Sequence, residues 1–311
     1  MFVHSLPYDD PQMHEQTELS TISQEEFDRG IKPEKSSRMD RVFETIQFII
    51  GFGWLRLIVL FLLTIIYLIL EIPCMITCYN RKICDIIIPF GIWIARLYIR
   101  ALLFCFGVYH IKINGEIDPN AKACVFNHQT IFDGPMIYVY RVFTVISMAE
   151  ILKVPFFGRI LVAANSLFID RSKNSGASEG IKNLMLDDSK FVGLSPEGKT
   201  TKGLYLLKFH TGGFLTDKPI QPVAIRYKTY FTFGKSGFSW VAGGFKEFVW
   251  RCFSTTFGVA EINFLPTIHY DEMQDKTPEE KALVCELKIA NFLGVKATNR
   301  SNREIYKKKV E

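Results

Sequence analysis

Residues 126–134 read Phe-Asn-His-Gln-Thr-Ile-Phe-Asp-Gly and continue the apolar run Ala123–Phe126. That run has the composition of a buried strand, and the polar residues after it are typical of a turn. On one regular helix, side chains five positions apart point about 140° away from each other, so His128 and Asp133 could not meet. They can meet if His128 lies on the turn and Asp133 on the helix that follows. The stretch therefore predicts a strand, a turn and a helix, with a histidine oriented by a carboxylate.

Strands and helices alternate through the rest of this region. The last predicted helix has a clear start, with Thr277 as N-cap, Pro278 in the first turn and Glu280 completing a capping box. Such alternation favours an α/β fold, with a mixed or parallel sheet covered by helices. The other predicted strands are Val108–Ile113, Phe143–Ser147, Ser166–Ile169, Phe191–Leu194, Gln221–Tyr227 and Glu261–Leu265, and the predicted helices are Phe156–Ala164, Ala177–Leu186 and Pro278–Phe292.

Two apolar segments precede this region. Residues 48–70 carry a single charge, at Arg56, and about 20 apolar residues suffice to cross the hydrocarbon core of a bilayer. Residues 86–109 contain Arg96 and Arg100, each of which costs about 3 kcal/mol near the centre of a spanning helix. We therefore expect the first segment to insert into a membrane, and the second to lie in the interface or to return as a hairpin.

Charge is distributed unevenly along the chain. The net charge is +5, but residues 1–40 hold nine acidic and four basic residues, a balance of −5 that leaves +10 on the remainder. A basic body suits an anionic membrane surface or an anionic substrate, although an ordinary solvated surface can have the same balance. The acidic segment has no sustained apolar period, so we expect it to be mostly disordered. The predicted divisions are a disordered acidic arm (1–41), membrane-anchoring helices (42–109), an α/β domain (110–296) and a basic tail (297–311).

The seven cysteines form neither a disulfide framework nor a zinc-binding pattern, since no Cys-x-x-Cys occurs. Their odd number favours free thiols that face a reducing compartment.

Three short motifs follow the histidine turn in order. They are Phe168-Ile169-Asp170-Arg171, Pro196-Glu197-Gly198 and Pro222-Val223-Ala224-Ile225. Together with His128 and Asp133, they resemble the four ordered blocks of the glycerolipid acyltransferase family. Four blocks in family order are far more specific than any one of them. The resemblance implies that residues 110–296 are an acyltransferase domain with the mixed, helix-covered sheet of that family.

The resemblance also implies roles for individual residues. His128 would take the proton from an acceptor hydroxyl, whose oxygen attacks the thioester carbonyl of acyl-CoA, and Asp133 would orient the imidazole. Arg171 would hold the acceptor phosphate, because a guanidinium group can donate two parallel hydrogen bonds to the oxygens of one phosphate. Lys173 would add positive charge, and Pro222 would line the acyl-CoA side.

The Pro-Glu-Gly turn helps to bind the glycerol phosphate part of the acceptor in this family. Glu197 and Gly198 occupy that turn. A carboxylate beside a phosphate is unusual on charge grounds, so we expect Glu197 to face a hydroxyl or Arg171. The chain departs from the family pattern at Lys199, where threonine is usual, and at Asn165, where glycine is usual. A lysine at position 199 can still contact a phosphate, but both departures bear on the choice of acceptor.

Within the family, the chain is nearest to the lysophosphatidylcholine acyltransferase branch, a similarity carried by Gln221–Tyr227 and Phe264-Leu265-Pro266. The implied function is esterification of a lysophospholipid in phospholipid biosynthesis or remodelling. Acyl-CoA would be the co-substrate, membrane lipid a partner, and no metal, bound cofactor or nucleic acid would take part. A glycerol-3-phosphate acyltransferase and a non-catalytic membrane scaffold of the same fold are the alternatives. A serine hydrolase would need a Gly-x-Ser-x-Gly elbow; the one match, Gly176-Ala177-Ser178-Glu179-Gly180, lies outside the four motifs.

Two short signals bear on location. Lys308 and Lys309 stand where the dilysine signal for retrieval to the endoplasmic reticulum stands, and that signal is read in the cytosol. Asn299-Arg300-Ser301 is a glycosylation sequon, which would need the opposite orientation. We expect an endoplasmic reticulum membrane protein with a cytosolic catalytic domain and C-terminus, because acyl-CoA is made in the cytosol. Lipid droplets are an alternative location.

Overall fold

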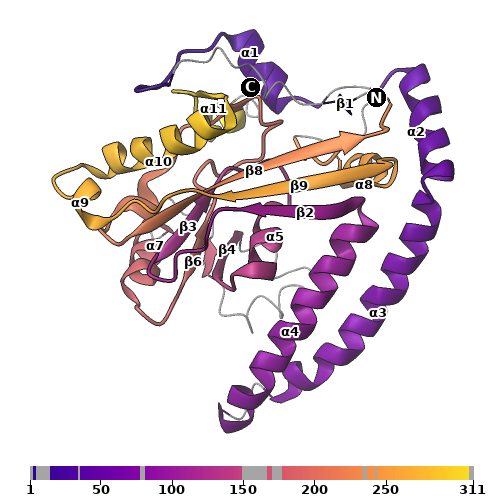
Figure 1. Cartoon of the computed structure of the whole chain (residues 1–311), viewed down its shortest axis with the longest axis horizontal. Coiled ribbons are helices and arrows are strands. Elements are labelled where there is room, and N and C mark those ends of the chain that lie inside the picture. Colours follow the sequence, from indigo (N-terminus) through magenta and orange to yellow (C-terminus); the bar gives the residue numbers. More distant parts are fainter. Residues whose placement is uncertain are drawn as a thin grey trace.

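The computed structural model describes residues 3–4, 15–33, 36–77, 81–148, 167–169, 177–233, 237–241 and 244–307. Its centre is a β-sheet with the strand order β2-β9-β8-β3-β6-β4-β5 (Figure 1). Strands β8 and β9 run antiparallel, and the other neighbouring pairs on this path run parallel, so the predicted mixed sheet is confirmed. The strands are β2 (Val108–Asn114), β3 (Ala123–Phe126), β4 (Thr144–Met148), β5 (Leu167–Ile169), β6 (Val192–Leu194), β8 (Ile220–Tyr230) and β9 (Phe257–Phe264), with β1 (Val3–His4) antiparallel to β8.

Helices cover both faces of the central strands. Successive side chains of a strand point to opposite faces, so a strand buried on both faces contributes to two cores. In β3, Ala123 and Val125 belong to a core cluster shared with α7 and α10, whereas Cys124 and Phe126 belong to a second cluster shared with α5 and α8. The sheet therefore lies between two helical layers. These covering helices are α5 (Asp133–Tyr140), α7 (Ala177–Leu186), α8 (Phe245–Phe253) and α10 (Pro278–Leu293).

Most of the predicted elements are present, with bounds that differ by a few residues. Helix α7 has the predicted bounds, and the predicted helix over 156–164 lies outside the described residues. The capping box at the start of α10 is confirmed, since the Thr277 hydroxyl accepts from the Glu280 N–H and the Glu280 carboxylate accepts from the Thr277 N–H. The helix ends at Gly294, whose φ of 69° is a left-handed conformation that favours glycine.

The chain before the hairpin is partly ordered, which corrects the prediction of a mostly disordered arm for residues 15–33. This segment contains α1 (Gln24–Ile31). Phe27 is fully buried, and the Tyr205 hydroxyl donates to its carbonyl at 2.6 Å. Ile31, one helical turn on, is also buried. A short apolar stripe thus suffices to hold this helix on the domain, although the surrounding sequence is strongly acidic.

The two apolar segments form helices α3 (Gly53–Thr77) and α4 (Arg81–Cys105), which lie antiparallel beside one another (Figure 1). The rings of Tyr67 and Tyr98 stack between them, with centroids 4.1 Å apart. Within the described ranges, residues 53–72 of α3 alone are long and apolar enough to cross a membrane. Of the two arrangements expected for the second segment, the structure has the helical hairpin, and whether either helix inserts into lipid stays a prediction.

Three arginines of these helices contact the domain. Arg56 is buried and donates to the carbonyl of Phe253 at 2.6 Å. Arg96 Nε donates to the carbonyl of Val139, at the end of α5, at 2.6 Å. The guanidinium of Arg100 also packs over an aromatic ring of α5. Each of these three guanidinium groups therefore has a partner on the protein side.

Candidate active site

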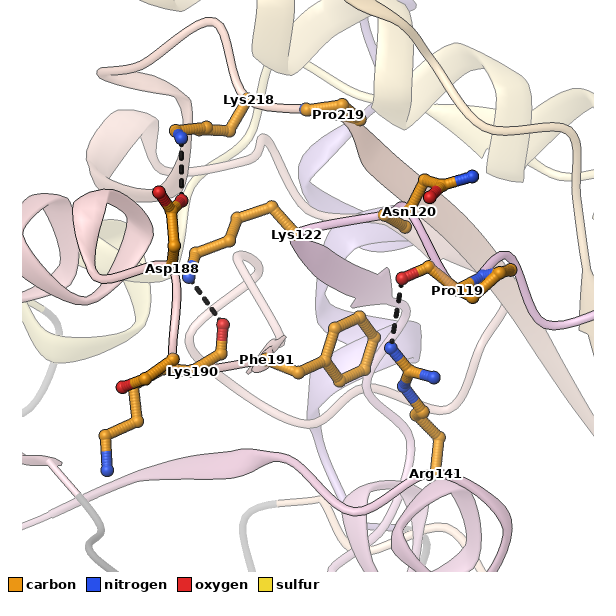
Figure 2. Close-up of a pocket in the computed structure, with 11 residues that line it drawn as sticks. Pro119, Asn120, Lys122, Arg141, Asp188, Lys190, Phe191, Lys218 and Pro219 are labelled. Atoms are coloured by element: carbon orange, nitrogen blue, oxygen red, sulfur yellow. Dashed lines mark hydrogen bonds and ion pairs between the residues drawn. The ribbon is translucent and has the colours of Figure 1, made fainter.

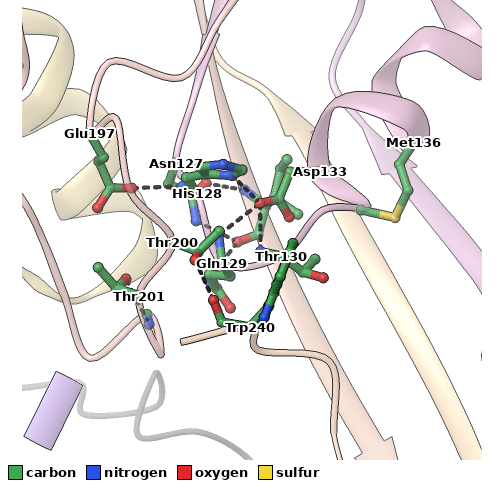
Figure 3. Close-up of polar contacts among 12 residues, drawn as sticks. Asn127, His128, Gln129, Thr130, Asp133, Met136, Glu197, Thr200, Thr201 and Trp240 are labelled. Carbon is green, nitrogen blue, oxygen red and sulfur yellow. Dashed lines mark hydrogen bonds and ion pairs between the residues drawn. The ribbon is translucent and has the colours of Figure 1, made fainter. Parts of the chain in front are cut away.

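The histidine turn lies at the carboxyl end of β3, and α5 begins at Asp133. His128 Nδ1 lies 2.8 Å from Asp133 Oδ2 (Figure 3), so the contact predicted between turn and helix is present. A carboxylate in this position accepts the Nδ1–H proton, and the neutral imidazole then carries its lone pair on Nε2. Because the His128 side chain is 27% exposed, a substrate can reach the ring.

Four donors converge on Asp133, which is fully buried. Besides the imidazole, Oδ2 accepts the N–H groups of Gln129 at 2.7 Å and Thr130 at 2.8 Å, and Oδ1 accepts the Tyr227 hydroxyl at 2.6 Å. Burial, together with the Asp133 carboxylate, raises the pKa of Tyr227 well above its usual value, which keeps that hydroxyl a donor. The four donors fix the carboxylate, and the carboxylate in turn fixes the imidazole ring.

Glu197 supports the turn from the other side (Figure 3). It is fully buried, and its two carboxylate oxygens accept the backbone N–H groups of His128 at 2.7 Å and Leu207 at 3.0 Å. Burial raises the pKa of Glu197 to about 8. Among the described residues, its hydrogen-bond partners are thus main-chain groups, and the expected contact with a hydroxyl stays a prediction. Arg171, the other expected partner, lies outside the described residues.

Backbone hydrogen bonds complete the support of the turn. The carbonyl of His128 accepts the Thr201 N–H at 2.9 Å, and the carbonyl of Gln129 accepts the Trp240 N–H at 2.9 Å. The Asn127 side chain accepts the Ile225 N–H at 2.7 Å and donates to the Ile225 carbonyl at 3.0 Å. These two bonds extend the pairing of β3 with β8 beyond the end of β3. Three separate parts of the chain thus hold this turn in one conformation.

The turn that carries Gly198 has a conformational requirement. Gly198 has a φ of 63°, and a Cβ there would lie 2.5 Å from Asn302 Nδ2, so a larger residue would meet both strain and a clash. Lys199 follows it and is half-buried.

Pro222 lies buried within β8, opposite Val125 of β3. It has no N–H to donate toward Leu265, and the Gln221 side chain donates to the Leu265 carbonyl at 3.3 Å instead. The structure therefore gives Pro222 a place in the sheet, and its predicted role beside acyl-CoA stays a prediction.

The expected phosphate-binding residues, Arg171 and Lys173, lie outside the described residues, as does Asn165. Strand β5 runs parallel to β4, and β4 and β3 run parallel to β6. The carboxyl ends of parallel strands meet at the same edge of a sheet, so the chain leaves β5 on the edge where His128 lies.

Sequence reasoning missed three supports of the turn, namely Tyr227, Thr201 and Trp240. The signal for Tyr227 was present in the alternation of β8. Val223, Ile225 and Tyr227 share the core cluster that contains residues of α5, which carries Asp133. Thr201 and Trp240 act through main-chain groups, for which the sequence has no signal.

A cavity of about 390 Å³ lies at the opposite edge of the sheet, next to the start of β3 (Figure 2). Two of its lysines have partners: Lys122 donates to the carbonyls of Asp187 and Lys190, and Lys218 pairs with Asp188 at 2.8 Å. Its place at this edge separates the cavity from the histidine turn. Among the described residues, no group of three or more His, Cys, Asp or Glu side chains is arranged to hold a metal ion.

Comparisons with known proteins agree with the four motifs. The acyltransferase family model matches residues 112–226. Lysophospholipid acyltransferase LPEAT2 of Arabidopsis thaliana is 29% identical over 216 residues, which cover 67% of this chain and 39% of that protein. Lysophospholipid acyltransferase LPCAT4 of Homo sapiens is 27% identical over 207 residues, which cover 64% of this chain and 39% of that protein. The chain spans about two fifths of the length of these relatives.

The fold is similar to the crystal structure of the 1-acyl-sn-glycerophosphate acyltransferase PlsC from Thermotoga maritima. The TM-score is 0.54 at 15% sequence identity, and the match covers 82% of this chain and 96% of that one. The predicted family and its fold are confirmed: residues 112–226, which contain the histidine turn and residues 220–226 of β8, match the acyltransferase family model, and the fold matches that of PlsC.

Proposed function

We propose that the protein is an acyl-CoA-dependent O-acyltransferase that esterifies a lysophospholipid. The observation that carries this proposal is the imidazole of His128, which is held through Nδ1 by a buried carboxylate and has a side chain that is 27% exposed. A base fixed in this way suits the removal of a proton from an alcohol. Relatives named as lysophospholipid acyltransferases support a lysophospholipid as the acceptor.

In the proposed reaction, His128 Nε2 takes the proton of the acceptor hydroxyl as the oxygen attacks the thioester carbonyl. The tetrahedral intermediate collapses with loss of the CoA thiolate, and the new ester bond replaces the C–S bond. The imidazolium that forms during the attack lies against the Asp133 carboxylate, which stabilises it. Its proton then passes to the thiolate or to water, which restores the base. No step requires a metal or a bound cofactor.

Arg171 and Lys173 are the proposed ligands of the acceptor phosphate. Their support is the end of β5 at the same edge of the sheet as His128. We further propose a location in the endoplasmic reticulum membrane with the domain in the cytosol, for which the dilysine pair at 308–309 is the support. Lipid droplets are the alternative location.

The test is an acyl-transfer assay on membranes that contain the full chain. Labelled oleoyl-CoA would be offered with lysophosphatidic acid, lysophosphatidylcholine, lysophosphatidylethanolamine or glycerol 3-phosphate. We expect transfer to a lysophospholipid, reduced about 10³-fold or more by His128→Ala. His110→Ala is the matched control, because His110 is exposed on β2. Transfer only to glycerol 3-phosphate would favour a glycerol-3-phosphate acyltransferase.

A non-catalytic scaffold is the remaining alternative, and the unusual Lys199 in the Pro-Glu-Gly block is the feature that favours it. It predicts no transfer to any acceptor from a folded, membrane-bound protein, and no gain of transfer in Lys199→Thr. Wild-type transfer that disappears in His128→Ala would exclude it.

A further inference from the structure

Helix α2 (Arg38–Ile50) turns its apolar side outward. A surface helix of a soluble protein normally turns its apolar stripe toward the core. Here the residues at spacings of three, four and seven form one exposed stripe. Its members are 39–68% exposed and are Met39, Val42, Phe43, Ile46, Ile49 and Ile50.

The polar side of α2 faces the domain instead. Glu44 is fully buried and accepts the indole N–H of Trp250 at 2.9 Å. Gln47 is 5% exposed and donates to the carbonyl of Phe231 at 3.1 Å. These buried hydrogen bonds fix the rotation of the helix about its axis, because turning it would leave them unmade. The outward apolar stripe is therefore enforced by the fold.

Two phenylalanines beside α2 are held in a strained backbone. Phe52 has a φ of 52° and is 60% exposed, and Phe231 has a φ of 53° and is 59% exposed. A bulky residue rarely adopts this left-handed region, and such strain marks functional positions. Both side chains are largely exposed in this conformation, so a surface that covered them would bury two large apolar groups.

Further exposed aromatic side chains extend the same surface. Phe233 is 49% exposed, and its ring lies 6.0 Å from that of Phe43. Phe245 is 56% exposed at the start of α8, a helix that Arg41 ties to α2 through Glu247 at 2.7 Å. We name this surface the α2 docking face; it consists of the exposed stripe of α2 with Phe52, Phe231, Phe233 and Phe245.

We propose that the α2 docking face binds a lipid bilayer, with α2 at the boundary between headgroups and acyl chains. The position of α2 in the chain indicates a bilayer as the partner of this face. Only residues 51 and 52 separate α2 from α3, which is long and apolar enough to cross a membrane along residues 53–72 (Figure 1). The proposal rests on the predicted insertion of α3, because a surface next to the end of an inserted helix lies close to the same bilayer. Aromatic residues concentrate at this depth, and the exposed Arg38 and Lys246 at its rim can meet lipid phosphates.

The test measures depth in the membrane and not activity, so it is independent of the proposed acyl transfer. The full chain would be reconstituted in phosphatidylcholine vesicles with nitroxide labels at Ile46→Cys or Phe233→Cys. Cys74, Cys78 and Cys84 would be replaced by serine, since Cys105, Cys124, Cys252 and Cys285 are buried. Oxygen partitions into lipid and a nickel chelate stays in water, so their relaxation effects report the depth of each label.

We expect a several-fold higher ratio of oxygen to nickel accessibility at positions 46 and 233 than at Asp271→Cys, an exposed control on α9 (Tyr270–Met273). Equal nickel accessibility at all three positions would overturn the proposal. Labels at 46 and 233 that are shielded from both reagents would also overturn it, because they would indicate a protein partner such as a second copy of the chain.

The contribution of the phenylalanines has its own test. Phe231→Asn with Phe233→Ser should lower the depth ratio at position 46, because asparagine accepts the left-handed backbone and adds no apolar surface. The matched control is Leu186→Ser, which removes an exposed leucine from α7 and should change nothing at position 46. An unchanged ratio in the double variant would remove the phenylalanines from the docking surface.

Discussion

Replacement of Asp133 by asparagine separates the charge of the carboxylate from its geometry. Oδ2 accepts three N–H donors, whereas Oδ1 meets one hydroxyl, that of Tyr227. An amide would therefore place its oxygen at the Oδ2 position and its NH₂ group at the Oδ1 position, where the Tyr227 hydroxyl can act as acceptor. His128 would keep its tautomer and orientation, and only the negative charge would be lost.

The size of the loss follows from the contact distance. The N···O distance is 2.8 Å, and the imidazolium charge is spread over the ring, so an effective separation of about 4 Å is reasonable. At an effective dielectric constant of about 20, the attraction is about 4 kcal/mol. Loss of this attraction in the transition state lowers kcat by about 10³-fold. KM for both substrates should change little, because neither substrate contacts Asp133 in the proposed reaction.

The assay is initial-rate acyl transfer in mixed micelles, with wild type, Asp133→Asn and Asp133→Ala compared at equal protein. Circular dichroism and thermal unfolding would establish that each variant is folded. We expect Asp133→Ala to lose more activity than Asp133→Asn, because it also frees the imidazole. A folded Asp133→Asn protein with kcat near wild type would refute the role of the carboxylate in stabilising the imidazolium.

Three further predictions rest on single contacts. Tyr227→Phe removes one of the four donors to Asp133 and should lower kcat about 3- to 10-fold with KM unchanged, measured in the same assay. Burial raises the pKa of Glu286, on α10, from 4.5 to about 9. Its contribution to the free energy of unfolding is therefore complete below about pH 4.5 and is lost as the pH rises toward 9. The unfolding temperature should fall less across this pH range in Glu286→Gln than in wild type. Phe27→Ala should destabilise the docking of α1 by about 3 kcal/mol, seen as faster trypsin cleavage after Arg29, whereas the exposed Leu186→Ala should leave that rate unchanged.

The central part of the sheet could be predicted from the sequence because its strands β3 and β6 are buried on both faces. Continuous apolar runs such as Ala123–Phe126 and Val192–Leu194 give a strong strand signal, and the capping box at Thr277 gives a strong helix start. The meeting of His128 with Asp133 was predictable for a different reason. A spacing of five residues admits a contact only across a turn.

The orientation of α2 and the order of α1 could not be predicted in the same way. The burial of Glu44 and Gln47 depends on Trp250 and Phe231, which lie about two hundred residues away in the chain. A sequence pattern gives the apolar stripe of a helix, but not the side that the stripe faces. For α1, the decisive partner is Tyr205, and composition alone favoured disorder.

The position of Glu197 explains why an acidic side chain can stand in the Pro-Glu-Gly motif, which is expected to lie near a phosphate. A carboxylate that contacts the acceptor directly would repel its phosphate, whereas a carboxylate that accepts the N–H groups of His128 and Leu207 acts on the catalytic turn. The His128 N–H and its carbonyl are then both bonded, the latter by Thr201, just beyond the same motif. The Pro-Glu-Gly block thus fixes the backbone of the proposed base, and Gly198 supplies the left-handed conformation, with a φ of 63°, between Glu197 and Thr201. On this reasoning, Glu197 is a positioning residue: its loss should lower kcat and leave KM for the acceptor unchanged, and a rise in KM alone would instead indicate direct contact with the acceptor.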